Sequence, residues 1–254
     1  MSRPVAIVTG VRRGIGRAIA VALARRGFDL VLNDLAPGAD LETTADEVRA
    51  AGAQATAAFA DIGDLAQHAG LLDAAWAAGP VACLVNNAGV SVAVRDDLLE
   101  VGVDSYDRCQ DVNTRGTFFL TQSFAKRLLA SSDLGSHRSI VIVSSANAEA
   151  VAIQRGEYCV SKAALAMVAK LFAVRLAGEG FGVHEIRPGI IASEMTARSK
   201  ERYDAFFAAG RNPIPRWGRP EEVGRCVAAC AAGELPYTAG QVIKADGGLT
   251  IPHF

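Results

Sequence analysis

The chain has 254 residues, half of them hydrophobic, and its 26 lysines and arginines nearly balance 27 aspartates and glutamates. This length allows one or two domains with a sizeable core, and the balanced charge argues against non-specific binding to nucleic acid or an anionic membrane. No apolar stretch approaches the roughly 20 residues of a membrane span, and no signal-peptide pattern is present. The five scattered cysteines contain no C-x-x-C pair, so we expect reduced thiols, no metal site and a cytoplasmic protein.

Short apolar runs alternate with amphipathic stretches along the chain. In order, the pattern predicts a strand at 5–8, a helix at 15–26, a strand at 30–32, a helix at 41–51, a strand at 55–60 and a helix at 65–78. There follow a strand at 81–85, a long helix at 106–130, a strand at 139–143, a helix at 158–178 and a strand at 183–186. A polar excursion at 193–220, long enough to form a lid, precedes a last helix at 221–232 and a last strand at 241–245.

Buried strands separated by helices of ten or more residues are typical of parallel βαβ units. The sequence therefore predicts an α/β fold, a doubly wound three-layer sandwich with helices on both faces of a mainly parallel sheet. No linker, internal repeat or low-complexity stretch divides the chain, so we expect residues 1–254 to form a single domain.

A glycine-rich turn connects the first predicted strand to the first helix. It runs Thr9-Gly10-Val11-Arg12-Arg13-Gly14-Ile15-Gly16, with the spacing G-x-x-x-G-x-G. Glycines at such a junction allow a tight turn and let backbone N–H groups approach a pyrophosphate at the helix N-terminus. The alternative is a tight turn with a purely structural role.

The residue expected to select the dinucleotide is Asp34, at the end of the second strand and 18 residues after Gly16. A carboxylate there accepts hydrogen bonds from the adenosine ribose hydroxyls and repels a 2′-phosphate. Arg12 and Arg13 have the opposite preference, because a guanidinium can bind that phosphate. We weight the carboxylate more and expect NAD(H), with NADP(H) as the alternative.

Polar residues also follow later strands, at the edge where open α/β sheets bind ligands. Asn86-Asn87-Ala88-Gly89 ends the fourth strand, and Ser144-Ser145 ends the fifth. Asn113 lies inside the helix between these strands, where asparagine is an indifferent helix former. Each feature alone also fits a structural role.

Tyr158 and Lys162 are four residues apart on a predicted helix and therefore share one face. The neighbouring ammonium and the dipole of the helix N-terminus both stabilise a phenolate relative to a phenol. A tyrosine in this setting can act as an acid or base at cellular pH. By chance such a pair is common, so its meaning depends on the rest of the chain.

Together these motifs resemble the short-chain dehydrogenase/reductase family over essentially the whole chain. The matches, in order, are T-G-x-x-x-G-x-G at 9–16, N-N-A-G at 86–89, Asn113, Ser145, Y-x-x-x-K at 158–162, P-G at 188–189, and G-Q…D-G-G at 240–241 and 246–248. The resemblance implies a Rossmann-type sheet of seven strands, a nicotinamide cofactor, a small alcohol or ketone substrate and usually a homotetramer.

The resemblance also assigns roles to residues. Asn113, Ser145, Tyr158 and Lys162 would be catalytic, with Tyr158 exchanging the proton and Lys162 holding the nicotinamide ribose. The cofactor would contact Thr9, Gly10, Arg12, Arg13, Gly14, Ile15, Gly16, Asp34, Asp61, Ile62, Asn87, Ala88, Gly89, Tyr158, Lys162, Pro188, Gly189 and Ile191.

The chain also departs from the family pattern. The segment after Ser145 lacks the usual glycines, so Asn147 and Glu149 are candidates to reach the substrate, as is Arg95 in the loop after Gly89. His184 replaces a family asparagine, which we interpret as a structural exchange.

The substrate stays open between two enzyme classes and one class without catalysis. An NAD-linked dehydrogenase of a small free alcohol or ketone is favoured by Asp34. An NADPH-dependent 3-oxoacyl-carrier-protein reductase is the alternative. Glu179, at the end of the helix that carries Lys162, argues against it, because its negative charge does not favour docking of an acidic carrier. A catalytically silent nucleotide sensor is disfavoured by the complete set of four catalytic residues.

The helix at 158–178 carries two apolar stripes, which we name by position. The inner stripe is Leu165, Val168, Phe172 and Leu176, and the outer stripe is Ala164, Met167, Leu171 and Val174. A helix that is apolar on two faces is expected to be buried on two sides, so one stripe covers the sheet and the other faces a partner subunit.

Overall fold

The computed structural model describes residues 2–131, 137–197 and 199–252. It contains a seven-stranded sheet of β1 (Val5–Thr9), β2 (Asp29–Asp34), β3 (Ala55–Phe59), β4 (Val81–Asn86), β5 (Arg138–Val143), β6 (Phe181–Pro188) and β7 (Val242–Ala245). The strand order is β3-β2-β1-β4-β5-β6-β7, and all neighbouring strands are parallel. The order reverses between β1 and β4, where open α/β sheets form a crevice at the carboxyl ends of their strands. The predicted Rossmann-type fold is confirmed.

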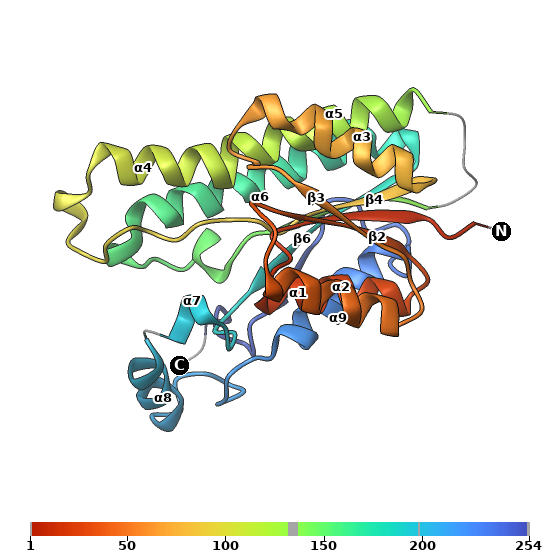
Figure 1. Cartoon of the computed structure of the whole chain (residues 1–254). Helices are drawn as coiled ribbons and strands as arrows, with labels where there is room; N and C mark the ends of the chain where they lie inside the picture. The colour runs from red at the N-terminus through yellow and green to blue at the C-terminus, as the bar shows by residue number, and fades with distance from the viewer. Residues whose placement is uncertain (1, 132–136, 198, 253–254) are drawn as a thin grey trace.

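Helices cover both faces of this sheet (Figure 1). One face carries α1 (Gly14–Arg25), α2 (Ala39–Ala50) and α9 (Pro220–Ala231), and the other carries α3 (His68–Ala78), α5 (Thr117–Leu129) and α6 (Gly156–Leu176). Each face has its own apolar core. Val8 belongs to the first core and its neighbour Ile7 to the second, because successive side chains of a strand point to opposite faces.

The predicted long helix at 106–130 differs from the structure in its start and its interior. It begins earlier, with α4 (Val103–Cys109), and continues through a π-helical segment, Gln110–Gly116, into α5. Short π segments are rare and occur inside α-helices, often at functional sites. The sequence pattern predicted one uninterrupted helix here and did not identify this segment.

Two other predicted stretches are subdivided. The predicted helix at 65–78 opens with a 3-10 turn, Leu65–Gln67, because the Asp64 side chain accepts a hydrogen bond from the backbone of Ala66 at 3.0 Å. The excursion at 193–220 contains two short helices, α7 (Glu194–Ala197) and α8 (Lys200–Ala208), which lie beyond the end of the sheet (Figure 1).

The two stripes of α6 differ in exposure. All four inner-stripe residues are buried against the second core. In the outer stripe, Met167, Leu171 and Val174 are 55%, 54% and 84% exposed in the single chain. The structure thus leaves the second apolar face of α6 uncovered.

Candidate functional site

A cavity of about 1860 Å³ lies at the carboxyl ends of the strands, where the strand order reverses. The turns after β1, β4, β5 and β6 line it together with the start of α6 and parts of α7 and α8. Almost all residues that the sequence predicts for the site line this one cavity; Thr9, Asn113 and Glu149 do not.

The glycine turn after β1 is packed too closely for side chains. A Cβ on Gly16 would lie 2.0 Å from the carbonyl oxygen of Gly10, and one on Gly10 would lie 2.8 Å from the Cα of Ala88. Gly10 and Gly14 also have φ of +69° and +57°, where glycine is favoured. The turn therefore leaves an exposed backbone cradle at the N-terminus of α1, suited to a pyrophosphate.

Thr9 lies behind this cradle rather than in it. It is fully buried, and its Oγ1 accepts hydrogen bonds from the backbone N–H groups of Asn87 and Ala88, both at 3.0 Å. The Asn87 side chain donates in turn to the carbonyl oxygens of Thr9 and Gly10 at 2.8 and 2.9 Å. These bonds fix the turn after β4 against the turn after β1.

The competing charges at the adenosine end are already paired with one another. Asp34 accepts from the Arg12 backbone N–H at 2.9 Å, and its second oxygen lies 3.0 Å from the Arg12 guanidinium. Arg13 forms an ion pair with Glu194 of α7. Both arginines that favour a 2′-phosphate thus already have a carboxylate partner.

Tyr158 and Lys162 lie one turn apart at the start of α6, on its buried side. Their exposed fractions are 7% and 3%, and the Lys162 Nζ lies 5.5 Å from the centre of the Tyr158 ring. Lys162 also donates to the carbonyl oxygen of Val143 at 3.4 Å, which ties it to the end of β5. Ser145 lines the same cavity, and its Oγ accepts from the Asn147 backbone N–H at 3.1 Å.

Asn113 lies in the π-helical segment and is fully buried. Its side chain accepts from the backbone N–H of Val90 at 2.8 Å and donates to the Val90 carbonyl at 3.0 Å. It also donates to the Ser161 hydroxyl at 2.9 Å, so it joins the turn after β4 to α6. A Cβ on Gly89 would lie 3.0 Å from the Asn113 Oδ1 and 3.3 Å from the Lys162 Nζ, which shows how closely these groups pack.

The remaining predicted cofactor contacts line the same cavity from three further turns. Asp61 and Ile62 follow β3, Ala88 and Gly89 follow β4, and Pro188, Gly189 and Ile191 lie at and beyond the end of β6. Arg95 lines the cavity mouth, as the sequence suggested it could.

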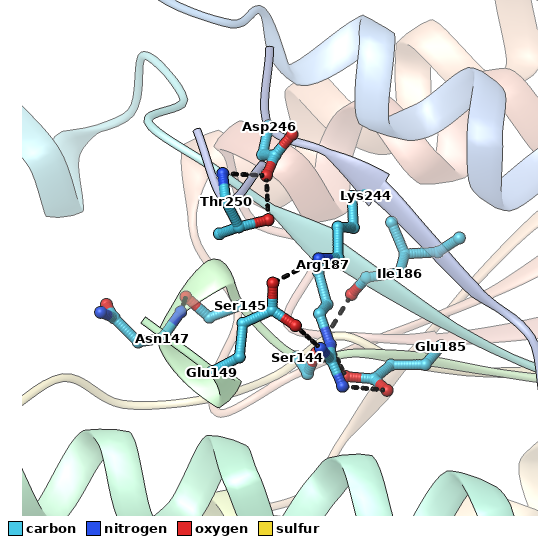
Figure 2. A network of polar contacts seen from close by, with 10 residues as sticks. All are labelled: Ser144, Ser145, Asn147, Glu149, Glu185, Ile186, Arg187, Lys244, Asp246 and Thr250. Atoms are coloured by element: carbon cyan, nitrogen blue, oxygen red, sulfur yellow. Dashed lines mark hydrogen bonds and ion pairs between the residues drawn. The ribbon is translucent and has the colours of Figure 1, made fainter. Parts of the chain in front are cut away.

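Glu149 and Asn147 differ in where their side chains point. Glu149 forms ion pairs with Lys244 and, at 2.5 Å, with Arg187, and it is not among the residues that line the cavity (Figure 2). The Lys244 hydrogen bond holds the pKa of Glu149 below its ordinary value despite the opposing effect of burial. The suggestion that Glu149 reaches the substrate is therefore replaced by a role in anchoring the turn after β5. Asn147 lines the cavity.

His184 is 2% exposed and lies 2.8 Å from the Thr238 hydroxyl, through its Nε2. Burial and, to a lesser extent, the nearby His137 lower the pKa of His184. These contacts fit the structural exchange that the sequence suggested.

Arg155 is a cavity residue that the sequence analysis did not identify. Arg155 stands three residues before Tyr158, and its guanidinium carbon lies 4.1 Å from the centre of the Tyr158 ring. The sequence shows a basic residue directly before the helix that carries Tyr158. Its position over the ring becomes visible only in the structure, where the turn before α6 brings the two side chains together.

Within residues 2–131, 137–197 and 199–252, no three or more His, Cys, Asp or Glu side chains are grouped so that they could hold a metal ion. In the same ranges, none of the helices combines the length and the apolar character that a membrane span needs. The five cysteines are free, and burial raises the pKa of the Cys83 and Cys230 thiols to about 12.

The parallel sheet and the glycine cradle at its strand reversal define a Rossmann-type dinucleotide-binding protein. The chain belongs to the short-chain dehydrogenase/reductase family. A family profile described as enoyl-(acyl carrier protein) reductase matches residues 10–250. A short-chain type dehydrogenase/reductase of Picea abies is 33% identical over 251 residues, which cover 96% of this chain and 91% of the relative.

Solved structures agree with this assignment. A 3-oxoacyl-[acyl-carrier protein] reductase from Brucella melitensis in complex with NAD is 41% identical, with a TM-score of 0.96 and complete coverage of both chains. A putative 2-deoxy-d-gluconate 3-dehydrogenase from Agrobacterium tumefaciens with bound NADP is 30% identical, with a TM-score of 0.85, covering 98% of this chain and 97% of its own. The chain is thus an NAD(P)-dependent oxidoreductase that acts on CH–OH groups.

Proposed function

We propose that this enzyme interconverts a small secondary alcohol and its ketone, with Tyr158 as the general acid and base. The observation that carries the proposal is the buried Tyr158–Lys162 pair beside Ser145 in the cavity whose other end holds the glycine cradle. Both ends of one cavity can then serve one reaction, because a dinucleotide bound along it reaches from the cradle to the phenol.

The four candidate catalytic residues have separate roles in this proposed reaction. When bound, the nicotinamide cofactor supplies or accepts the hydride. Tyr158 donates a proton to the carbonyl oxygen in reduction and accepts the alcohol proton in oxidation, and Ser145 hydrogen-bonds the same oxygen. Lys162 stabilises the phenolate and holds the nicotinamide ribose, and Asn113 keeps the turn after β4 in register with α6 and positions a water for proton relay.

The remaining cofactor residues bind and orient. The backbone of the glycine turn takes the pyrophosphate, with Thr9 supporting it from behind. Asp61 and Ile62 contact the adenine, and Ile191 meets the carboxamide.

NAD(H) is the preferred cofactor in this proposal. At the end of β2, the Asp34 carboxylate would accept hydrogen bonds from the adenosine ribose and repel a 2′-phosphate, and Arg12 and Arg13 are each paired with a carboxylate. The Brucella melitensis relative holds NAD, which supports this preference, whereas the Agrobacterium tumefaciens relative holds NADP.

A second candidate is reduction of 3-oxoacyl groups on a carrier protein, because the Brucella melitensis relative bears that name. The charge at the end of α6 argues against this carrier-protein candidate. Arg175, the basic residue of the last turn, lies 3.4 Å from Glu179 in an exposed i,i+4 pair. Such a pair leaves little net positive charge for an acidic carrier. The third alternative of the sequence analysis, a non-catalytic nucleotide sensor, does not agree with the membership of this chain in a family of oxidoreductases.

Assembly, domain and location belong to the same proposal. The exposed outer stripe of α6 supports a homotetramer, and two cores sharing one sheet support a single domain over residues 1–254. The free cysteines fit a cytoplasmic location.

The test is a screen of sugars, polyols, hydroxy acids and secondary alcohols with NAD and NADP, followed by Tyr158→Phe on the best substrate. Turnover should fall by at least about a hundredfold, because the variant has no exchangeable proton, while NADH binding stays the same. Tyr106→Phe, outside the cavity and 41% exposed, serves as the matched control. Near-normal turnover of Tyr158→Phe would overturn the mechanism.

A further inference from the structure

Arg155 occupies an unusual place in the cavity. It ends a 3-10 turn, Ile153–Arg155, directly before α6, and its guanidinium lies over the ring of Tyr158 at 4.1 Å. A cation over an aromatic face is attracted by the ring. This contact holds the guanidinium beside the phenol ring, in the cavity that both residues line.

The hydrogen-bond partners of Arg155 are neutral and distant. Its two terminal nitrogens lie 3.3 Å from the Asn147 Oδ1 and 3.4 Å from the Ser91 Oγ, near the limit for a hydrogen bond. Its Nε is buried without a partner, and none of the ion pairs among the described residues includes Arg155. Glu157, two residues away, instead accepts from the Ser105 hydroxyl at 2.7 Å.

The charges around the cavity are distributed unevenly. Its acidic lining residues are Asp34, Asp61 and Glu194, and two of them are paired with Arg12 and Arg13 at the cofactor end. The remaining arginines that line the cavity are Arg95, Arg108, Arg155, Arg202 and Arg211. Apart from the two paired carboxylates, the charged residues that line the cavity are therefore mostly basic, although the whole chain is almost neutral.

A partly buried guanidinium without a counter-ion loses hydration that neutral partners at long distance only partly replace. An oxyanion would restore it through charge-assisted hydrogen bonds, and the planar guanidinium edge matches a carboxylate in a bidentate arrangement. We propose that Arg155 binds a carboxylate of the substrate, so that the physiological substrate is a short hydroxy acid or its oxo acid. This inference rests on the proposed function, because it places the carboxylate close to the carbon that reacts at Tyr158.

The kinetic test compares acids with neutral partners of similar shape. The pairs are lactate with propane-1,2-diol, 3-hydroxybutyrate with butane-1,3-diol, and D-gluconate with D-glucitol; sn-glycerol 3-phosphate with glycerol tests a phosphate ester. At least one acid should exceed its neutral partner in kcat/KM. Arg155→Gln should lower kcat/KM for that acid by about ten- to a hundredfold, mainly through KM, and change the neutral partner by less than about threefold. Arg49→Gln, which removes an exposed charge outside the cavity, should change neither.

A second measurement does not depend on turnover. Titration calorimetry follows each hydroxy acid binding to the enzyme saturated with NADH, a pair that cannot react because both are reduced. The preferred acid should bind the wild type and lose about tenfold or more in affinity for Arg155→Gln.

Several results would overturn the inference. If no acid surpasses its neutral partner in either measurement, or if the phosphate ester surpasses every carboxylate, Arg155 does not select a carboxylate. If Arg155→Gln slows acid and neutral substrates equally, Arg155 only positions Tyr158. In each of these cases the inference about Arg155 fails, but the Tyr158→Phe variant is still inactive. If the proposed function itself is wrong, the Tyr158→Phe variant is active.

Discussion

Single side chains at the two ends of the cavity carry opposite charges, and their pairing determines which ligands they accept. At the adenosine end, Asp34 holds Arg12 through both its backbone N–H and its guanidinium. In the proposed preference for NAD(H), this carboxylate would repel a 2′-phosphate, and it already pairs with the arginine that could bind one. At the substrate end, Arg155 has no such partner among the described residues, so its charge remains available to a ligand.

Removing the Asp34 carboxylate should therefore change cofactor preference in two ways. In Asp34→Ala, NADH loses hydrogen bonds to its ribose, and Arg12 becomes free to bind a 2′-phosphate. We expect the ratio of NADH to NADPH affinity to fall by about tenfold or more, measured by fluorescence titration. Asp46→Ala, an exposed residue of α2 paired with Arg49, is the control. A wild type that binds NADPH tenfold tighter than NADH would contradict the preference for NAD(H).

At the scale of elements, the candidate site depends on how the ends of β5, β6 and β7 are joined. Arg187 at the end of β6 lies 2.7 Å from Glu185 and 2.5 Å from Glu149, and Glu149 also pairs with Lys244 of β7 (Figure 2). Ser144, directly before Ser145, donates to the same Glu185 carboxylate. This network holds the turn that presents Ser145 to the cavity.

Arg187→Met should reveal the strength of this network. It leaves Glu185, which is fully buried, without its positive partner, and breaking such a buried pair costs about 3–5 kcal/mol of unfolding free energy. Urea denaturation measures the loss.

The double variant Glu185→Gln with Arg187→Met is the control, since it removes both charges together. It should be more stable than Arg187→Met alone. Equal stability of the two variants would show that the ion pair contributes nothing specific.

For the whole molecule, the outer stripe of α6 predicts how chains associate. The helix buries its inner stripe against the sheet, and Leu171 and Val174 remain 54% and 84% exposed on the opposite side. Apolar residues gathered on one helix face are typical of protein–protein contacts. Covering this face would also stiffen the helix that carries Tyr158.

The wild type should therefore sediment at micromolar concentration as an oligomer, well above the 26.5 kDa of one chain. The double variant Leu171→Glu and Val174→Glu should shift it towards the monomer, because charges at a buried apolar contact are costly. Leu99→Glu, an 88% exposed residue outside α6, tests whether any added surface charge has this effect. A monomeric wild type would contradict the assembly.

The sequence by itself determined the parts of this protein that depend on local periodicity and spacing. Alternation of strands and helices predicted the parallel sheet, and the four-residue spacing of Tyr158 and Lys162 placed them on one helix face. The glycine spacing at 9–16 predicted a backbone cradle, and strand ends at Asp34, Gly89 and Ser145 predicted one shared edge, because parallel strands place their carboxyl ends together.

Only the tertiary structure decided the features that depend on residues far apart in the chain. The π-helical segment around Asn113, the pairing of Asp34 with Arg12, the direction of Glu149 and the stacking of Arg155 on Tyr158 all depend on contacts between different elements. Side-chain direction and charge pairing depend on which groups the packed fold brings within reach. The sequence pattern therefore predicted the candidate catalytic groups, and the folded chain determined which charged side chains around them lack a carboxylate partner among the described residues.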